Sequence, residues 1–217
     1  VLSGADYHHT ETLLDKDLRP YSNKYWDTNP FAPSSLLFYV GFDKKIENAS
    51  LHTLFFDTAF ALHAEAIYYN PKWPTNPLFY ANFTSMTDNT SAPEGKEAGF
   101  FLIPLAPGIE DTEELREEYF HKMLERFEQL TNQEVKKSVI FKRSFCVNDF
   151  KEEYNSYKGN AYGMANTLLQ TAFLRPQIKS SKVNNLYFTG QLTVPGPGVP
   201  PALISGKIAS ELIKKNK

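Results

Sequence analysis

The residues best suited to chemistry stand in one glycine- and proline-rich segment of the sequence. It reads Asn185-Leu186-Tyr187-Phe188-Thr189-Gly190-Gln191, then Pro195-Gly196-Pro197-Gly198-Val199-Pro200-Pro201, and continues as an apolar and small-residue run to Ile213. This pattern predicts a strand, a loop and a helix in that order. Pro201 fits the first helical turn, where its missing N–H costs nothing and its φ is already helical.

The predicted helix has a start that favours a negatively charged ligand. Its positive pole lies near Gly198 and Val199, because lysines gather at the other end. A glycine-lined helix start with free N–H groups suits a ligand that carries or develops negative charge, such as a phosphate or a reduced flavin. A tight strand-to-helix turn, whose glycines serve backbone geometry alone, explains the same pattern equally well. The small residues along the helix indicate a close approach by another segment: Ala202, Ser205, Gly206, Ala209 and Ser210.

The titratable residues predict little further chemistry. The five histidines show no metal-ligand spacing, so we interpret them as surface or satisfied core residues and expect no metal. Cys146 has no recognisable activating partner and is interpreted as a small core residue. Asp149 and Tyr154 precede a glycine-bearing stretch, but nothing in the sequence selects a proton acceptor. The catalytic residues therefore remain unknown at this stage.

Composition excludes several classes of function. The 217 residues include 23 Lys and Arg and 25 Asp and Glu, so the chain has no net positive charge to attract nucleic acid. No run of about 18 apolar residues occurs, so we expect peripheral contact as the form of any membrane association. A single cysteine fits a reducing compartment, and we predict the cytoplasm. The sequence opens without Met or a signal-peptide pattern, as though cut from a longer chain.

Hydrophobic patterning predicts a mixed fold with antiparallel strands. Residues 35–42 and 51–56 are interpreted as a hairpin, and the other strands are expected at 1–4, 78–83, 99–105, 139–147 and 183–189. A short helix capped by Asp6 is expected to reach Leu14. A long helix follows Asp111, which forms a capping-box pattern with Glu114, and its acidic face is interpreted as solvated. A further helix is expected over 161–174.

Several ordered motifs resemble one enzyme family. The segment from Phe188 to Gly206 resembles the carboxy-terminal signature of bacterial-type phytoene desaturases, which are FAD-dependent carotenoid dehydrogenases of the flavin amine-oxidase-like superfamily. Weaker similarities occur in the same order, and together they cover essentially the whole chain: Ser3-Gly4-Ala5-Asp6, residues 34–41, Ala92-Pro93-Glu94-Gly95, and 157–176 with Gly159 and Gly163.

The resemblance implies an α+β or α/β fold that is part of a two-domain FAD-dependent oxidoreductase. Residues 1–17 would belong to the FAD-binding domain as a returning segment. Residues 18–182 would form most of an antiparallel-sheet substrate domain with flanking helices. Residues 183–217 would form the carboxy-terminal strand and helix of the FAD-binding domain. No G-x-G-x-x-G pyrophosphate motif is found among the 11 glycines. We therefore expect this chain to be a carboxy-terminal fragment that binds FAD poorly and is inactive alone.

The resemblance also assigns cofactor-binding residues by position. Gly190 and Gln191 would lie near the ribityl and pyrophosphate part of FAD, where a side chain at residue 190 would obstruct the cofactor. Gly198 and Val199 would face the isoalloxazine ring. Their N–H groups, with that of Ala202, would stabilise charge on the reduced flavin.

The activity implied by the resemblance is desaturation of phytoene or a related carotenoid precursor, with hydride passing to FAD and a proton lost from the adjoining carbon. An aromatic β-layer would line a tunnel for the long apolar isoprenoid. The candidate residues, of which at least half are expected in the core, are Phe38, Tyr39, Phe55, Phe56, Tyr80, Phe100 and Phe101. Alternatives are a flavin-dependent carotenoid isomerase or oxygenase, or a non-catalytic isoprenoid-binding module.

Overall fold

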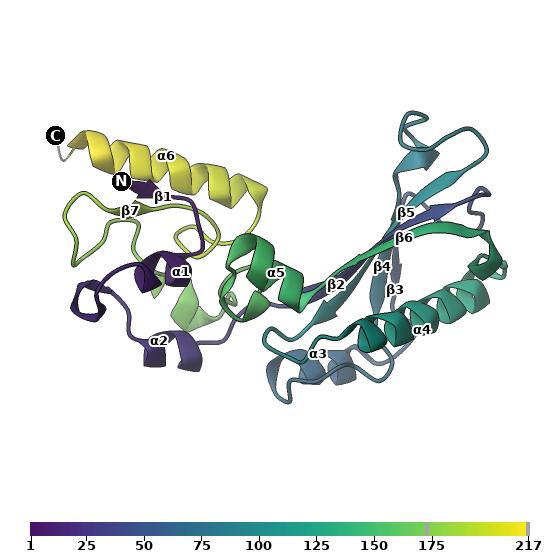
Figure 1. The fold of residues 1–217 in the computed structure, drawn as a ribbon, viewed down its shortest axis with the longest axis horizontal. Coiled ribbons are helices and arrows are strands. Elements are labelled where there is room, and N and C mark those ends of the chain that lie inside the picture. The colour runs from purple at the N-terminus through teal and green to yellow at the C-terminus, as the bar shows by residue number, and fades with distance from the viewer. Residues whose placement is uncertain (172–173, 216–217) are drawn as a thin grey trace. The chain divides into compact units, whose positions relative to one another are not determined.

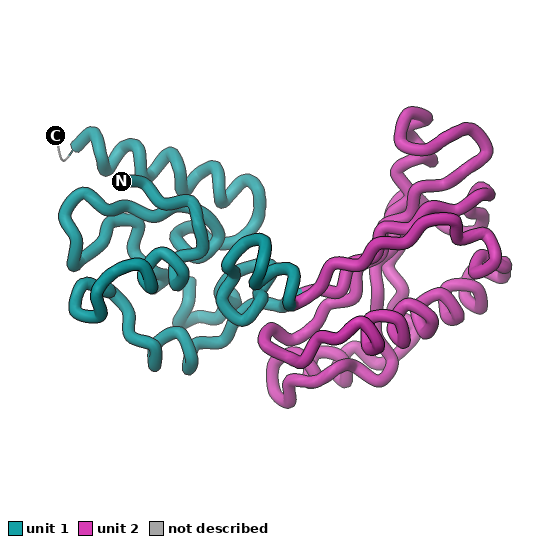
Figure 2. The backbone as a smooth tube through the Cα atoms, viewed as in Figure 1, with its two compact units in different colours: residues 1–34, 148–217 teal, residues 35–147 magenta. Residues whose placement is uncertain are grey.

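The chain folds into two compact units that differ in secondary structure. The computed structural model describes residues 1–171 and 174–215. Unit 1 comprises residues 1–34 and 148–217, and unit 2 comprises residues 35–147 (Figure 2). The strands are β1 Leu2–Ser3, β2 Ser34–Phe42, β3 His52–Phe55, β4 Phe79–Phe83, β5 Glu97–Leu105, β6 Val139–Phe145 and β7 Tyr187–Phe188. The α-helices are α1 Tyr7–Thr12, α2 Asn23–Thr28, α3 Phe60–Tyr68, α4 Glu113–Thr131, α5 Val147–Tyr154 and α6 Val199–Lys215 (Figure 1).

Unit 2 is built on a five-stranded sheet in the order β3-β4-β5-β2-β6. The pairs β3–β4, β4–β5 and β2–β6 are antiparallel. Alternate residues of β2 and β5 point into the core, as a half-buried strand requires. The long helix α4 lies along the sheet (Figure 1) and fills this core with Tyr119, Phe120, Met123, Leu124 and Phe127.

The predicted hairpin between 35–42 and 51–56 is wrong, although both strands form. β2 lies between β5 and β6, whereas β3 pairs with β4 at the sheet edge. An apolar run identifies a strand but not its neighbour, and the long connection between these two segments has no tight-turn sequence that fixes the pairing.

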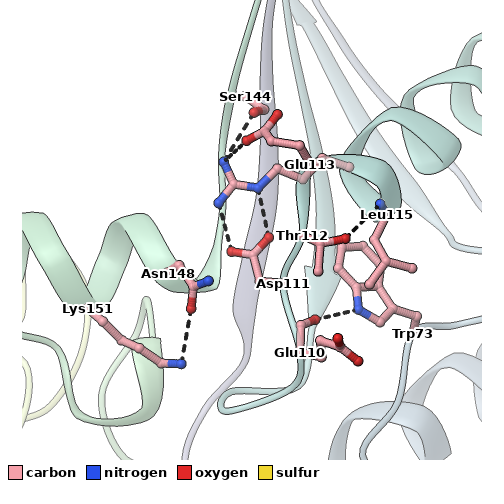
Figure 3. Close-up of polar contacts among 10 residues, drawn as sticks. Trp73, Glu110, Asp111, Thr112, Glu113, Leu115, Ser144, Asn148 and Lys151 are labelled. Carbon is pink, nitrogen blue, oxygen red and sulfur yellow. Dashed lines mark hydrogen bonds and ion pairs between the residues drawn. The ribbon is translucent and has the colours of Figure 1, made fainter.

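A set of polar contacts surrounds the start of α4 (Figure 3). The helix is capped by Thr112, which accepts from Leu115 N–H at 3.3 Å, so the predicted capping role of Asp111 is wrong by one residue. Asp111 instead receives two hydrogen bonds of 2.7 Å from the guanidinium of Arg116. Trp73 Nε1 donates to Glu110 O at 2.7 Å.

Unit 1 brings together segments far apart in the sequence. β1 pairs in parallel with β7, and Tyr187 N–H donates to Val1 O at 3.0 Å. Asp6 caps α1 as predicted, accepting from His9 N–H at 3.1 Å. Tyr7 stacks on Phe188 with ring centroids 3.6 Å apart. The first 34 residues therefore form one core with residues that follow position 147.

The predicted helix over 161–174 is absent from the described part of that range, and residues 172–173 lie outside the described residues. Gly163 has φ +74°, and its O accepts from Ala32 N–H at 2.8 Å. Ala165 N–H donates to Pro30 O at 3.1 Å. The backbone thus bonds to residues 30–33 instead of to its own next turn, with one short 3₁₀ turn at Leu168–Gln170. Tertiary pairing overrides the helical pattern here.

Candidate functional site

The strand, loop and helix predicted around residue 190 are all present in unit 1. β7 ends at Phe188, a loop follows, and α6 begins at Val199 with Pro200 and Pro201 in its first turn. No acidic residue stands in that turn, whereas Lys214 and Lys215 stand in the last turn. The helix start consequently has a partial positive charge that no side chain of its own first turn offsets.

Strand β7 approaches the small-residue face of α6, as the sequence predicted. Ser205 is fully buried, and its Oγ accepts from Gly190 N–H at 2.9 Å. The same oxygen lies 2.6 Å from Thr189 Oγ1 and 2.6 Å from Ala202 O. A Cβ at Gly206 would stand 3.8 Å from Thr189 Oγ1. The hydroxyl of Ser205 therefore fixes the turn after β7 against the helix.

The two glycines nearest the predicted cofactor adopt backbone conformations that favour glycine. Gly190 has φ +108° and Gly198 has φ +109°. A Cβ at Gly190 would have no atom within 4 Å, so the space beside it is open. These observations fit a backbone that a ligand approaches closely.

The helix start has few N–H groups that are not already bonded. Ala202 N–H donates to Gly198 O at 2.9 Å, so this group is engaged within the helix. Pro200 and Pro201 have no N–H. Within the first turn, Val199 is left as the residue whose N–H has no acceptor in the helix. Whether Gly190, Gln191, Gly198, Val199 and Ala202 contact a cofactor stays a prediction.

Arg175 packs against Gly196 in the loop before α6 and was not among the predicted site residues. Its side chain is 1% exposed, and its guanidinium donates to Met164 O at 3.1 Å, to Gln191 O at 3.4 Å and to Asn166 Oδ1. Within residues 1–171 and 174–215, its Nε is the one buried side-chain nitrogen or oxygen without a hydrogen-bond partner. A Cβ at Gly196 would stand 3.1–3.3 Å from this guanidinium. Burial lowers the pKa of Arg175 from its ordinary value. The sequence feature that could have pointed to this residue is its position directly before Pro176.

Six of the seven tunnel candidates lie on the two faces of the unit 2 sheet, three on each. Phe38, Phe55 and Phe101 are buried in the core. Tyr39, Phe100 and Tyr80 share the opposite face and form a continuous aromatic row across β2, β5 and β4. Ring centroids are 5.4 Å apart for Tyr39 and Phe100 and 6.2 Å apart for Phe100 and Tyr80. Phe56 follows β3 and is largely exposed.

A polar group ends this row. His52 Nδ1 lies 2.6 Å from Tyr80 Oη and 3.0 Å from Asn82 Nδ2. Asn82 Nδ2 also donates to Leu51 O at 2.9 Å, and an amide nitrogen is a donor only. His52 Nδ1 is therefore the acceptor in this cluster, which places the proton of the neutral ring on Nε2.

His63 and Cys146 are buried and have structural roles. His63 is buried and bonded at both ring nitrogens, to Pro104 O at 2.8 Å and to Leu78 N–H at 2.9 Å. Cys146 is fully buried in the core of unit 2, which confirms its interpretation as a core residue, and burial raises the pKa of its thiol. In the described residues, no group of three or more His, Cys, Asp or Glu side chains is placed to hold a metal ion.

The fold of the chain has a counterpart among solved structures. An oxidoreductase from Methanosarcina mazei matches 97% of this chain and 42% of its own, with a TM-score of 0.61 at 15% identity. At that identity the likeness establishes the fold, and it agrees with the predicted oxidoreductase architecture. No family model matches the chain.

The relatives narrow this class further. The chain is 42% identical to a carotenoid 3,4-desaturase of Haloarcula japonica over 214 residues, which are 98% of this chain and 43% of the relative. It is 30% identical to a 4,4'-diapophytoene desaturase of Staphylococcus aureus strain Newman, covering 99% of this chain and 45% of that protein. The chain is thus homologous to carotenoid desaturases, which confirms the resemblance, and it spans less than half their length.

Proposed function

We propose that this chain forms part of an FAD-dependent desaturase that acts on phytoene or a related carotenoid precursor. The homology to carotenoid desaturases over nearly the whole chain carries the proposal. When bound, FAD supplies the two-electron oxidation, taking a hydride from one substrate carbon while the adjoining carbon loses a proton. The open space beside Gly190 and the unsatisfied, buried Nε of Arg175 fit a cofactor held against this loop.

Residues of this chain would hold the cofactor through the backbone. Gly198 and Val199 would lie against the isoalloxazine ring, with the helix start stabilising negative charge on the reduced flavin. Gly190 and Gln191 would lie beside the ribityl and pyrophosphate part. On this basis residues 1–17 and 183–217 contribute to the FAD-binding domain and 18–182 to the substrate domain.

The substrate would lie along the aromatic row of unit 2. Tyr39, Phe100 and Tyr80 give a broad apolar surface that needs no polar partner from a hydrocarbon chain. Since Phe38 and Phe101 belong to the core behind the sheet, changes on the two faces have different consequences. The open face governs substrate binding and the covered face governs stability.

The decisive experiment uses the complete gene product that contains this chain. The protein is supplied with FAD and with phytoene in liposomes, and the products are separated and identified by absorbance. Longer conjugated chromophores support desaturation. Bound flavin with unchanged phytoene contradicts the substrate, and colour change without added double bonds favours an isomerase.

The cofactor placement has its own test. We expect Gly198→Val in the complete protein to reduce FAD retention, because the side chain crowds the ring and the φ of +109° disfavours a branched residue. Gly95→Val is the matched control, since Gly95 has φ +75° and open space but lies in a loop of unit 2. Normal FAD content in Gly198→Val contradicts the placement.

We further propose that the complete protein acts in the cytoplasm and contacts a membrane peripherally. No helix in the described ranges has the length and apolar character needed to cross a bilayer. Phe56, Phe60 and Leu62 are each more than half exposed in and beside α3. We expect Phe60→Glu with Leu62→Glu to reduce co-flotation with lipid vesicles, whereas Leu130→Glu on α4 leaves it unchanged. Equal flotation of the unmodified protein, the double variant and Leu130→Glu contradicts contact through α3.

A further inference from the structure

We propose that Arg175 is a positioning residue, which holds the loop at residues 194–198 in the form that receives the flavin and whose unneutralised charge favours the reduced cofactor. The proposal rests on the proposed function, because it concerns the same loop.

The hydrogen bonds of Arg175 define the positioning role. The guanidinium bonds Met164 O, Asn166 Oδ1 and Gln191 O, so one side chain links the segment around residue 165 to the loop before α6. It packs so closely beneath Gly196 that even a Cβ there would press on it at 3.1–3.3 Å. A planar guanidinium with several fixed donors is suited to this arrangement, and a lysine ammonium is not.

The charge of Arg175 defines the second part of the role. All three described acceptors are neutral oxygens, and no described carboxylate forms an ion pair with the guanidinium. Arginine keeps its proton at neutral pH, so a positive charge is buried here without an opposite charge. In a low-dielectric interior such a charge acts over several ångströms. A nearby ligand that gains negative charge on reduction is therefore stabilised in its reduced form.

The unpartnered Nε supports a ligand at this place. A buried donor left without an acceptor destabilises the folded protein, which is why native structures seldom retain one. Arg175 packs against Gly196, three residues before α6 begins, and both its charge and the helix start favour a group that carries negative charge.

Three variants of the complete protein separate position from charge. Arg175→Lys keeps the charge but loses the planar fork, so we expect reduced FAD retention with an almost unchanged potential. Asn166→Asp keeps Arg175 in place but neutralises it with a carboxylate, so we expect normal FAD retention and a lower potential. Arg175→Gln removes both the charge and the planar fork, so we expect reduced FAD retention and a lower potential. Asn166 is exposed, so we expect its conversion to Asp to leave the fold intact. Arg19→Gln is the control, because Arg19 bonds only Leu14 O and Thr12 O among its described hydrogen bonds.

The measurements are FAD content after gel filtration and reductive titration against a dye, in excess FAD. We expect the equilibrium constant for flavin reduction to fall at least tenfold in Asn166→Asp and Arg175→Gln, which is about 30 mV for a two-electron couple. A folded Asn166→Asp protein with an unchanged potential overturns the charge role. Wild-type FAD retention in Arg175→Lys overturns the positioning role. Absence of flavin from the unmodified protein overturns the proposed function together with this inference.

Discussion

The two units of this chain are stabilised in different ways. Unit 2 has one large apolar core beneath a sheet, in which Phe127 lies within 6 Å, centroid to centroid, of the rings of Phe55, Phe83 and Phe101. Unit 1 has smaller apolar clusters, joined by single buried polar groups such as Glu11, Arg175 and Ser205. Loss of a core ring in unit 2 therefore creates a cavity, whereas loss of one of these polar groups in unit 1 leaves its partner without a hydrogen bond.

The largest expected effect is in the core of unit 2. Phe127→Ala removes a fully buried ring and should lower the free energy of unfolding of unit 2 by about 3–5 kcal/mol. Chemical denaturation followed by the fluorescence of Trp73 measures it, since Trp73 packs against this core and Trp26 belongs to unit 1. Leu130→Ala, which truncates a half-exposed residue of the same helix, is the control. Equal losses in the two variants would contradict the comparison.

The next effect depends on pH and belongs to unit 1. Burial raises the pKa of the Glu11 carboxyl to about 7, although Trp26 Nε1 and Tyr21 N–H donate to it at 2.7 and 2.9 Å. The unfolded carboxyl loses its proton near its ordinary pKa of about 4.5. The folded form therefore holds a proton that the unfolded form has lost between these pH values, so stability falls as pH rises from about 4.5 to 7.

The change attributable to Glu11 is about 3 kcal/mol across that interval. Glu11→Gln should abolish this part of the pH dependence, as measured by denaturation at several pH values with Trp26 as the probe. Glu153→Gln, an exposed substitution in the same unit, is the control. An unchanged pH profile in Glu11→Gln would show that other groups determine it.

A smaller effect is expected at the turn after β7. Ser205→Ala leaves Gly190 N–H without its acceptor, and we expect a loss of about 1–3 kcal/mol in the stability of unit 1 together with weaker FAD retention in the complete protein. Ser210→Ala removes an exposed hydroxyl from the same helix and should have little effect. Full FAD retention in Ser205→Ala would show that the cofactor does not depend on this turn.

The smallest stability effect should accompany a loss of substrate binding. Phe100→Ala acts on the half-exposed aromatic row, so its cost in unfolding free energy should be below about 1.5 kcal/mol. Turnover of the polyene by the complete protein should nevertheless fall. Phe101→Ala, the neighbouring residue on the buried face, should instead lower stability strongly. Normal turnover in Phe100→Ala would contradict the open face as a substrate surface.

The two units differ in how much of their structure the sequence predicted, and one physical reason explains the difference. Short apolar runs located β2, β4 and β5, and helical periodicity located α4, because each element packs against the core. Strand pairing was not predictable from that signal, so the supposed hairpin was wrong. In unit 1, the segment after Gly163 lost its expected helix because its backbone bonds to residues 30–33.

The candidate site was predictable where local geometry governs it. Gly198 and Pro201 predicted the start of α6, and Asp6 predicted the cap of α1, since each depends on neighbours in the chain. The sequence did not predict the hydrogen-bond partners of Arg175, because Met164, Asn166 and Gln191 are set by tertiary structure. The predicted division at residues 17 and 182 concerns which residues serve cofactor or substrate, and it stays a prediction. The compact units divide at 34 and 147.

The parallel pairing of β1 with β7 has a consequence for biosynthesis. Residues 35–147 leave the ribosome before any of the residues that complete unit 1, so the sheet of unit 2 can form while Leu2 and Ser3 still lack their partners. Residues 1–34 must wait, unpaired, until Tyr187 and Phe188 are translated. Nascent chains halted before that point should therefore expose Tyr7 and Trp26 to proteases and chaperones while the intervening sheet is already protected.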